Sequence, residues 1–163
     1  MKSIQGIPTK IFSLTELLMQ VKRWRLQNKK IVFTNGVFDI LHEGHIASLS
    51  EAASFGSILI VGVNGDASVK RLKGNNRPVN NENARQLLLA SLIMTDAVIL
   101  FETDTPLELI TALLPDVLVK GGDYTLDQVV GAKQVLDAGG EVKIANTVHG
   151  ISTTAMIEKI KTA

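Results

Sequence analysis

The chain reads Ile31-Val-Phe-Thr-Asn-Gly-Val-Phe-Asp-Ile-Leu-His-Glu-Gly-His45, a short apolar run followed by a loop that holds two of the three histidines. The apolar run predicts a buried strand over 31–34. A helix is expected to begin at Gly44 or His45, and the free N–H groups of a helix start suit a phosphate. Imidazole N–H groups beside that start would add donors to the same anion. The stretch therefore predicts a phosphate site directly after the first core strand.

Apolar runs and longer amphipathic stretches alternate along the rest of the chain. Further strands are expected at 58–63, 97–101, 117–119 and 142–145, and helices near 14–27, 45–55, 82–93, 106–113, 127–138 and 153–161. Such alternation is typical of βαβ units around a parallel sheet that is covered on both faces. It predicts an α/β fold with a Rossmann-like, doubly wound, parallel five-stranded sheet, which binds ligands at the carboxyl ends of its strands.

Length and composition fit one domain over residues 1–163. The chain is 45% hydrophobic and 20% charged, and its formal net charge is +1. So small a charge gives no sign of a nucleic-acid or membrane-surface partner, and no apolar run is long enough to predict a membrane span. Cysteine is absent, which excludes disulfides, thiolate metal ligands and a cysteine nucleophile. A reducing compartment suits this composition, and a cytoplasmic location is expected.

The pair His42 and His45 allows three interpretations. Histidines at this spacing are often plain surface or helix-capping residues. A zinc site is the second interpretation, but only His149 and carboxylates remain as further ligands, and their spacing matches no zinc motif. A phosphate site is the third, and the position after the first strand of a Rossmann-like pattern favours it. The loop is neither a dinucleotide fingerprint nor a Walker loop.

Two stretches far apart in the sequence resemble the signatures of the cytidylyltransferase-like nucleotidyltransferases. The first, Asn35-Gly-Val-Phe-Asp-Ile-Leu-His-Glu-Gly-His45, is similar to their His-x-Gly-His motif, and the second is Gly150-Ile-Ser-Thr-Thr154 before the last helix. Further stretches at 63–74, 77–80, 105–110 and 115–124 resemble the heptose 1-phosphate adenylyltransferase branch of the family. The resemblance covers roughly residues 10–160, and it implies a single nucleotidyltransferase domain over 1–163.

The resemblance also implies a reaction. ATP and D-glycero-β-D-manno-heptose 1-phosphate would give ADP-heptose and pyrophosphate, for the heptose of bacterial lipopolysaccharide. Mg²⁺ is expected to accompany the ATP, and no metal is expected to be held by protein side chains alone. In two-domain relatives this unit follows a sugar kinase, so a separate heptose kinase is expected upstream. Relatives tend to be dimers or larger, so a homo-oligomer is expected.

The resemblance and the local chemistry together assign the candidate site residues. His42, His45 and Lys73 are expected to be catalytic, with His45 as the transition-state donor, because a sugar phosphate needs no general base and the reaction needs donors that stabilise charge. The residues expected to bind ATP are Asn35, Gly36, Phe38, His42, His45, Lys120, Gly121, Asp123, Tyr124, Ser152, Thr153 and Thr154. Those expected to bind the sugar phosphate are Asp39, Asp66, Arg71 and Arg77.

These assignments have plainer alternatives. The hydroxyls at 152–154 are what any helix N-cap uses, and the basic stretch at 70–73 fits a solvated surface. Asp39 could instead position a histidine, and Asp66 could only cap a helix. Two other functions also stay open: the same chemistry with CTP and glycerol 3-phosphate, and a nucleotide-binding domain without turnover. Trp24, the only tryptophan, is expected to pack in the core.

Overall fold

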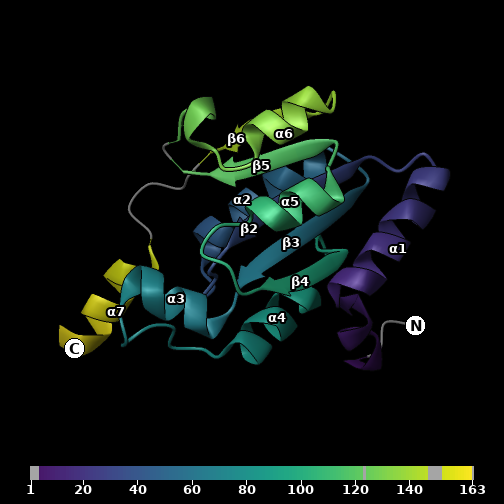
Figure 1. The fold of residues 1–163 in the computed structure, drawn as a ribbon. Coiled ribbons are helices and arrows are strands. Elements are labelled where there is room, and N and C mark those ends of the chain that lie inside the picture. Colours follow the sequence, from purple (N-terminus) through teal and green to yellow (C-terminus); the bar gives the residue numbers. More distant parts are fainter. Residues whose placement is uncertain (1–3, 123, 147–151, 163) are drawn as a thin grey trace.

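A parallel sheet forms the centre of the computed structural model, which describes residues 4–122, 124–146 and 152–162 (Figure 1). Six strands run in the order β1-β4-β3-β2-β5-β6, and all neighbouring pairs are parallel. They are β1 (Ile11–Phe12), β2 (Ile31–Gly36), β3 (Ile58–Asn64), β4 (Ala97–Phe101), β5 (Val117–Gly121) and β6 (Glu141–Ala145). The predicted α/β, Rossmann-like, doubly wound architecture is confirmed.

The predicted number of five strands is wrong by one. The additional strand is β1, which pairs with β4 at the edge of the sheet. It contains only Ile11 and Phe12, and two residues are too few to stand out as an apolar run. The five expected strands all form, and their ends differ from the predicted bounds by two residues at most.

Seven α-helices accompany the strands in the described ranges. They are α1 (Leu14–Leu26), α2 (Glu43–Ser54), α3 (Asp66–Lys73), α4 (Glu82–Ser91), α5 (Leu107–Leu113), α6 (Ala132–Asp137) and α7 (Thr153–Thr162). A capping box of Ser13 and Glu16 starts α1, as its sequence pattern predicts. None of the helices in this part of the chain is both long and apolar enough to cross a lipid bilayer.

Two helical predictions need correction. The helix α3 was not predicted, because it is only eight residues long and only Ser68 and Val69 of it are buried. The helix expected over 127–138 is divided into a 3-10 helix, Leu126–Gln128, and α6. Gly131 lies between them with a φ of 85°, a conformation that glycine adopts without steric cost, and a Cβ there would meet Ile110.

The sheet separates two apolar layers. On one face, α1, α5 and α6 pack against strand residues such as Phe33 and Ile60. On the other face, α2 and α4 pack against Val32 and Val61. Successive residues of a strand point to opposite faces, so the central strands supply both layers and read as continuous apolar runs. Trp24 packs against the first of these layers, which confirms its predicted role.

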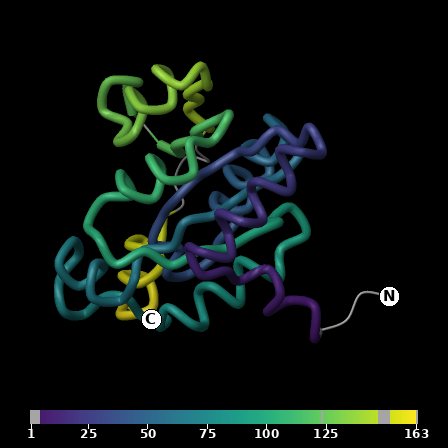
Figure 2. The backbone as a smooth tube through the Cα atoms, turned by 45° about the vertical axis from the view of Figure 1, so that its right-hand side comes forward, coloured from purple at the N-terminus to yellow at the C-terminus, as the bar shows by residue number. Residues whose placement is uncertain are grey.

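The strand order creates a crevice in the middle of the sheet. From β2 the chain adds β3 and β4 on one side, and it then crosses back to add β5 and β6 on the other. The loops after β2 and β5 therefore leave in opposite directions, which is where doubly wound sheets bind ligands. Figure 2 shows that α7, in yellow, lies beside the teal segment that carries α3 and the loop after it. The last helix thereby returns to the carboxyl ends of the strands.

Candidate active site

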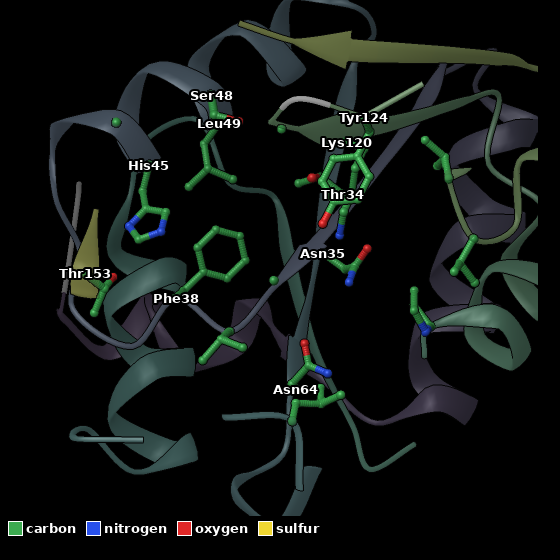
Figure 3. A pocket seen from close by; sticks show the side chains of 18 of the residues that line it. Thr34, Asn35, Phe38, His45, Ser48, Leu49, Asn64, Lys120, Tyr124 and Thr153 are labelled. Carbon is green, nitrogen blue, oxygen red and sulfur yellow. The ribbon is translucent and has the colours of Figure 1, made fainter. Parts of the chain in front are cut away.

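A cleft of about 580 Å³ opens at the carboxyl ends of β2, β3 and β5 (Figure 3). The starts of α2 and α7 and the end of α3 also border it. Twelve of the residues predicted for ATP binding or catalysis line this one cleft: Asn35, Gly36, Phe38, His42, His45, Lys73, Lys120, Gly121, Tyr124, Ser152, Thr153 and Thr154. Asp123, also predicted to bind ATP, lies outside the described residues, as do His149 and Gly150.

The two histidines stand at the head of α2. His42 is the N-cap residue, and its ring stacks on that of His45 with centroids 3.8 Å apart and planes inclined by 21°. The Phe38 ring meets His45 edge-on at 5.3 Å. Phe38 has a φ of 49°, and the missing Cβ of Gly36 leaves room for its ring. The backbone of the loop thus holds an aromatic wall against the histidine pair.

Both rings present an unpaired nitrogen. The Nδ1 atoms of His42 and His45 are buried and have no hydrogen-bond partner among the described residues. Burial of a polar nitrogen without a partner is unfavourable, so such atoms call for an explanation. A phosphate that enters the cleft would supply acceptors for imidazole N–H groups.

The histidines are neutral near pH 7. Burial, together with the neighbouring charges of His42 and Lys73, lowers the pKa of His45 to about 4. Burial also lowers the pKa of His42, and Glu43 opposes this shift. A neutral imidazole has one N–H donor and one acceptor nitrogen. An anion bound beside the rings would favour their protonated, doubly donating forms.

Two lysines border the cleft, one at the end of a helix and one on a strand. Lys73 ends α3, after β3, and partial burial and the Arg77 charge lower its pKa, while Asp39 opposes the shift. Lys120 is half-buried in β5, with its Nζ 5.4 Å from the centroid of the Tyr124 ring. Burial lowers the pKa of Lys120. None of the described ion pairs includes either lysine, so both positive charges are available to a ligand.

The start of α7 is tied to the histidine loop. The Thr153 hydroxyl donates to the carbonyl oxygen of Ile40 over 3.4 Å, and the Ser152 hydroxyl accepts the N–H of Ala155. Ser152 therefore does cap its helix, as the plainer alternative proposed. Because Ser152, Thr153 and Thr154 also line the cleft, the free N–H groups of this helix start lie where an anion would be bound.

The four residues predicted to bind the sugar phosphate do not line the cleft. Each forms an ion pair with a protein side chain: Asp39 with Arg77 at 2.6 Å, Asp66 with Arg85 at 2.7 Å, and Arg71 with Asp104 at 2.7 Å. Asp66 is the first residue of α3, and Gly65 is the N-cap residue. Their roles in substrate binding stay predictions, but the contacts described for them are structural.

Asp39 is the most fully engaged of the four. Its carboxylate accepts the backbone N–H groups of Val79 and Asn80 and the Nε–H of Arg77. Burial raises the pKa of Asp39, but these hydrogen bonds and the Arg77 charge outweigh it, so the pKa lies below its ordinary value. The charged carboxylate joins the histidine loop to the segment that follows α3.

Sequence reasoning missed several residues of the cleft. Ser48, Asn64, Leu72, Asp104 and Gln128 are among its lining. Asn64 ends β3, and a search of all strand ends could have found it. Ser48 follows His45 by three residues on α2, a spacing that keeps both on one helix face. The Nδ2 of Asn64 donates to Ser68, which in turn donates to the Thr103 carbonyl. The side-chain amide is thereby held at the floor of the cleft.

Comparison with known proteins places the chain in a family. The cytidylyltransferase-like family model matches residues 33–159. The chain is 51% identical to the bifunctional protein HldE of Koribacter versatilis over 97% of its own length and 32% of that relative, and 54% identical to the HldE of Marinomonas sp. over 91% and 31%. It thus spans about a third of the length of these curated relatives.

Two solved structures resemble the chain in fold. A lipopolysaccharide core biosynthesis protein from Thermoplasma volcanium matches with a TM-score of 0.60 and 30% identity, over 74% of this chain and 97% of that one. A pantoate-beta-alanine ligase from Francisella tularensis matches with a TM-score of 0.61 over 93% of this chain and 76% of that one, and its 15% identity shows likeness of fold alone. Since the family model spans both signatures and most of the sequence, the chain belongs to the cytidylyltransferase-like family of nucleotidyltransferases.

Proposed function

We propose that the chain is an adenylyltransferase, which joins the AMP part of ATP to D-glycero-β-D-manno-heptose 1-phosphate and releases pyrophosphate. The observation that carries this proposal is one cleft in which the histidine pair, Lys73 and the start of α7 meet. The heptose assignment is supported by the stretches at 77–80 and 115–124. It is also supported by the 30% identity to a lipopolysaccharide core biosynthesis protein.

The chemistry needs no general base. A sugar phosphate is an anion near neutral pH, and one of its oxygens attacks the α-phosphorus of ATP. The bond from that phosphorus to the oxygen bridging to the β-phosphate breaks, and pyrophosphate leaves with the electron pair. No covalent intermediate forms on the protein. The protein has to hold two anions in line and to stabilise charge on the transferring group and on the pyrophosphate.

The cleft offers a donor for each of these tasks. The N–H groups at the starts of α2 and α7 suit the phosphates of ATP, with the rings of His42 and His45 beside the first of them. Lys73 approaches from the β3 side of the cleft and Lys120 from the β5 side. We keep the assignment of transition-state donation to His45 that the resemblance suggests. Its buried Nδ1, like that of His42, lacks any described protein partner.

Magnesium fits the cleft only as a companion of the triphosphate. The described residues contain no group of three or more histidines or carboxylates that could hold a metal ion, and Asp104 is the only carboxylate among the described lining residues. Mg²⁺ is commonly held by one or two carboxylates together with substrate phosphates. Asp104, which pairs with Arg71 at 2.7 Å in this structure, would be its candidate protein ligand once released from that ion pair. When bound, the ion would neutralise charge on the triphosphate.

Three further expectations belong to this proposal. A kinase activity would supply the heptose 1-phosphate. A homo-oligomer and a cytoplasmic location are expected for the enzyme. They depend on the resemblance to the family and on composition, and none is needed for the proposed chemistry.

A panel assay of pyrophosphate release tests the function. Each of ATP, CTP, GTP and UTP would be combined with heptose 1-phosphate, mannose 1-phosphate or glycerol 3-phosphate, with Mg²⁺ present. We expect the highest kcat/KM for ATP with heptose 1-phosphate, and loss of that activity in His45→Ala. A preference for CTP with glycerol 3-phosphate would replace the proposed substrates. Nucleotide binding without pyrophosphate release in any combination would indicate a non-catalytic domain.

A further inference from the structure

Arg85 lies outside the cleft, yet it contacts three of the segments that surround it. It belongs to α4, and no residue of α4 lines the cleft. Its side chain is 0% exposed, which is exceptional for an arginine. Nε donates to the Asn80 carbonyl over 3.0 Å, Nη1 to the Val37 carbonyl over 2.7 Å, and Nη2 to Asp66 over 2.7 Å.

Each of the three partners controls a different part of the cleft. Val37 precedes Phe38, the residue with positive φ that supports the histidine pair. Asp66 is the first residue of α3, and Lys73 is the last. Asn80 donates to Asp39 through its backbone N–H and its side-chain amide. One guanidinium group therefore joins the histidine loop, the helix that carries Lys73 and the segment between α3 and α4.

Two residues of α4 form hydrogen bonds with the first residue of α3. Glu82, one turn before Arg85 on α4, accepts the backbone N–H of Asp66 over 2.7 Å. The first turn of α4 therefore holds Asp66 by its main chain and by its carboxylate. A guanidinium is a planar fork of donors with fixed directions, whereas an ammonium group is a point charge on a flexible stem. A lysine at position 85 would keep the charge but could not reproduce three divergent hydrogen bonds.

We propose that Arg85 is a positioning residue that fixes the histidine pair and Lys73 relative to each other. It acts through Val37, Asp66 and Asn80 and touches neither substrate. Its kinetic consequence rests on the proposed nucleotidyl transfer in this cleft. The nucleotide-binding residues of β5 lie on the other side of β2 and share no described contact with Arg85. Loss of the guanidinium should therefore misplace the phosphate donors and leave much of nucleotide binding intact.

Two variants test this inference, and they differ in how strongly the substitution is expected to disturb folding. Arg85→Lys removes the fork and retains the charge. Asp66→Asn keeps Arg85 and weakens only its link to α3, at a side chain that is 29% exposed. The matched control is Arg25→Ala, because Arg25 also donates to backbone carbonyls, those of Leu113 and Leu114, and lines no described part of the cleft. Thermal unfolding of all variants would show which are folded under assay conditions.

We expect kcat to fall by roughly 10- to 100-fold in both variants, the scale of a misplacement of about 1 Å. The Kd of ATP, measured directly by titration, should change by no more than about twofold, which corresponds to roughly 0.4 kcal/mol. The double variant should lose little more than the worse single one, because both changes break the same link. Arg25→Ala should retain wild-type turnover.

A raised Kd of ATP with normal kcat would overturn the inference, as would normal kinetics in folded Asp66→Asn. If the fall in kcat is fully explained by the fraction of unfolded protein, Arg85 stabilises the fold and does not position the catalytic residues. If Arg85→Lys does not fold, Asp66→Asn decides together with the titration of the His45 ring, because Asp66 is also predicted to bind the sugar phosphate.

A second measurement does not depend on the reaction. Because the Lys73 charge helps to lower the pKa of His45, an NMR titration of the His45 ring reports how near Lys73 lies. The pKa should rise in Asp66→Asn and Arg85→Lys, and it should also rise in the reference variant Lys73→Ala. An unchanged pKa in folded variants would contradict the positioning role even if the wild-type chain transferred no nucleotide. Failure of the proposed function and failure of this inference are thereby distinguishable.

Discussion

The β3 side and the β5 side of the cleft differ in how they use charge. On the β3 side, three arginines each form an ion pair with a carboxylate: Arg77 with Asp39, Arg85 with Asp66 and Arg71 with Asp104. On the β5 side, the half-buried Lys120 faces the ring of Tyr124, and it has no carboxylate partner among the described ion pairs. The β3 side is therefore largely a neutralised framework, from which Lys73 projects.

This difference shows which charges near a cleft are available to a ligand. A cation that already donates to a buried carboxylate is held in one geometry and supplies little extra attraction to an anion. A cation held only by an aromatic ring keeps its charge for whatever enters. We therefore expect substitutions on the β3 side to affect stability and alignment, and substitutions at Lys120 and the histidines to affect ligand binding and turnover.

The strongest test of the framework is Asp39→Ala. The Asp39 side chain is 1% exposed and that of Arg77 is 13% exposed, so the change leaves a largely buried cation and two N–H groups without their acceptor. Breaking a buried pair in this way costs about 3–5 kcal/mol of unfolding free energy. Chemical denaturation would measure it. The matched control is Glu141→Ala, because Glu141 pairs with Lys30 and Lys143 at an exposed site, where about 0–1 kcal/mol is expected for each pair. Equal losses in both would refute the distinction.

His45→Ala addresses turnover instead. Loss of one preorganised donor costs about 2.7–4 kcal/mol of transition-state stabilisation, or roughly 100- to 1,000-fold in kcat. The Kd of ATP should change far less, because the donor acts mainly on the transition state. Single-turnover kinetics with direct ATP titration would separate the two effects. A variant that keeps more than half of the wild-type turnover would remove His45 from the catalytic residues.

Lys120→Met should weaken ATP binding with a smaller effect on kcat. A hydrogen bond to a charged group contributes about 1.5–3 kcal/mol, so the KM for ATP should rise by roughly 10-fold or more while the KM for the sugar phosphate stays the same. Steady-state kinetics with each substrate varied in turn would measure this. A rise in the KM for the sugar phosphate alone would mean that Lys120 binds the sugar phosphate and not ATP.

The pKa of His45 makes stability depend on pH. Its folded-state pKa is about 4, below the ordinary 6.5, so the unfolded chain binds the proton more readily between these values. The unfolding free energy should therefore fall as the pH drops from about 6.5 toward 4, while this group has no effect above 6.5. Thermal unfolding at pH 7 and pH 5 should show a smaller loss in His45→Asn than in the wild type. The same loss in both would mean that another group is responsible.

The sequence predicted the fold well because its signals are local. Continuous apolar runs marked five strands, and the histidine loop directly follows the first of them in the sequence. The same reasoning placed Lys120 and Thr153, from distant parts of the chain, in one cleft. β1 was missed because it has only two residues, and α3 because only Ser68 and Val69 of its eight residues are buried.

Contacts between residues far apart in the sequence could not be predicted from local sequence patterns. Nothing in the sequence states that Arg85 reaches back to Val37, or that Asp39 is held by Val79 and Asn80. Those contacts depend on how α4 packs on the sheet. For this reason Asp39, Asp66 and Arg77 were predicted to contact substrate from their positions after strands, whereas the described contacts tie them to the protein.

Arg71 gives the smallest expected effect and the finest test of the comparison. It was predicted to bind the sugar phosphate, yet it donates to Asp104 and to the Glu102 carbonyl. Both partners of this ion pair are 50% exposed, so Arg71→Ala should cost about 0–1 kcal/mol of stability and leave the KM for the sugar phosphate within about twofold. A rise of 10-fold or more in that KM for Arg71→Ala would mean that Arg71 leaves Asp104 when the substrate binds. The β3 side would then hold a cation available to the ligand, and its description as a neutralised framework would apply only to the buried pairs of Asp39 and Asp66.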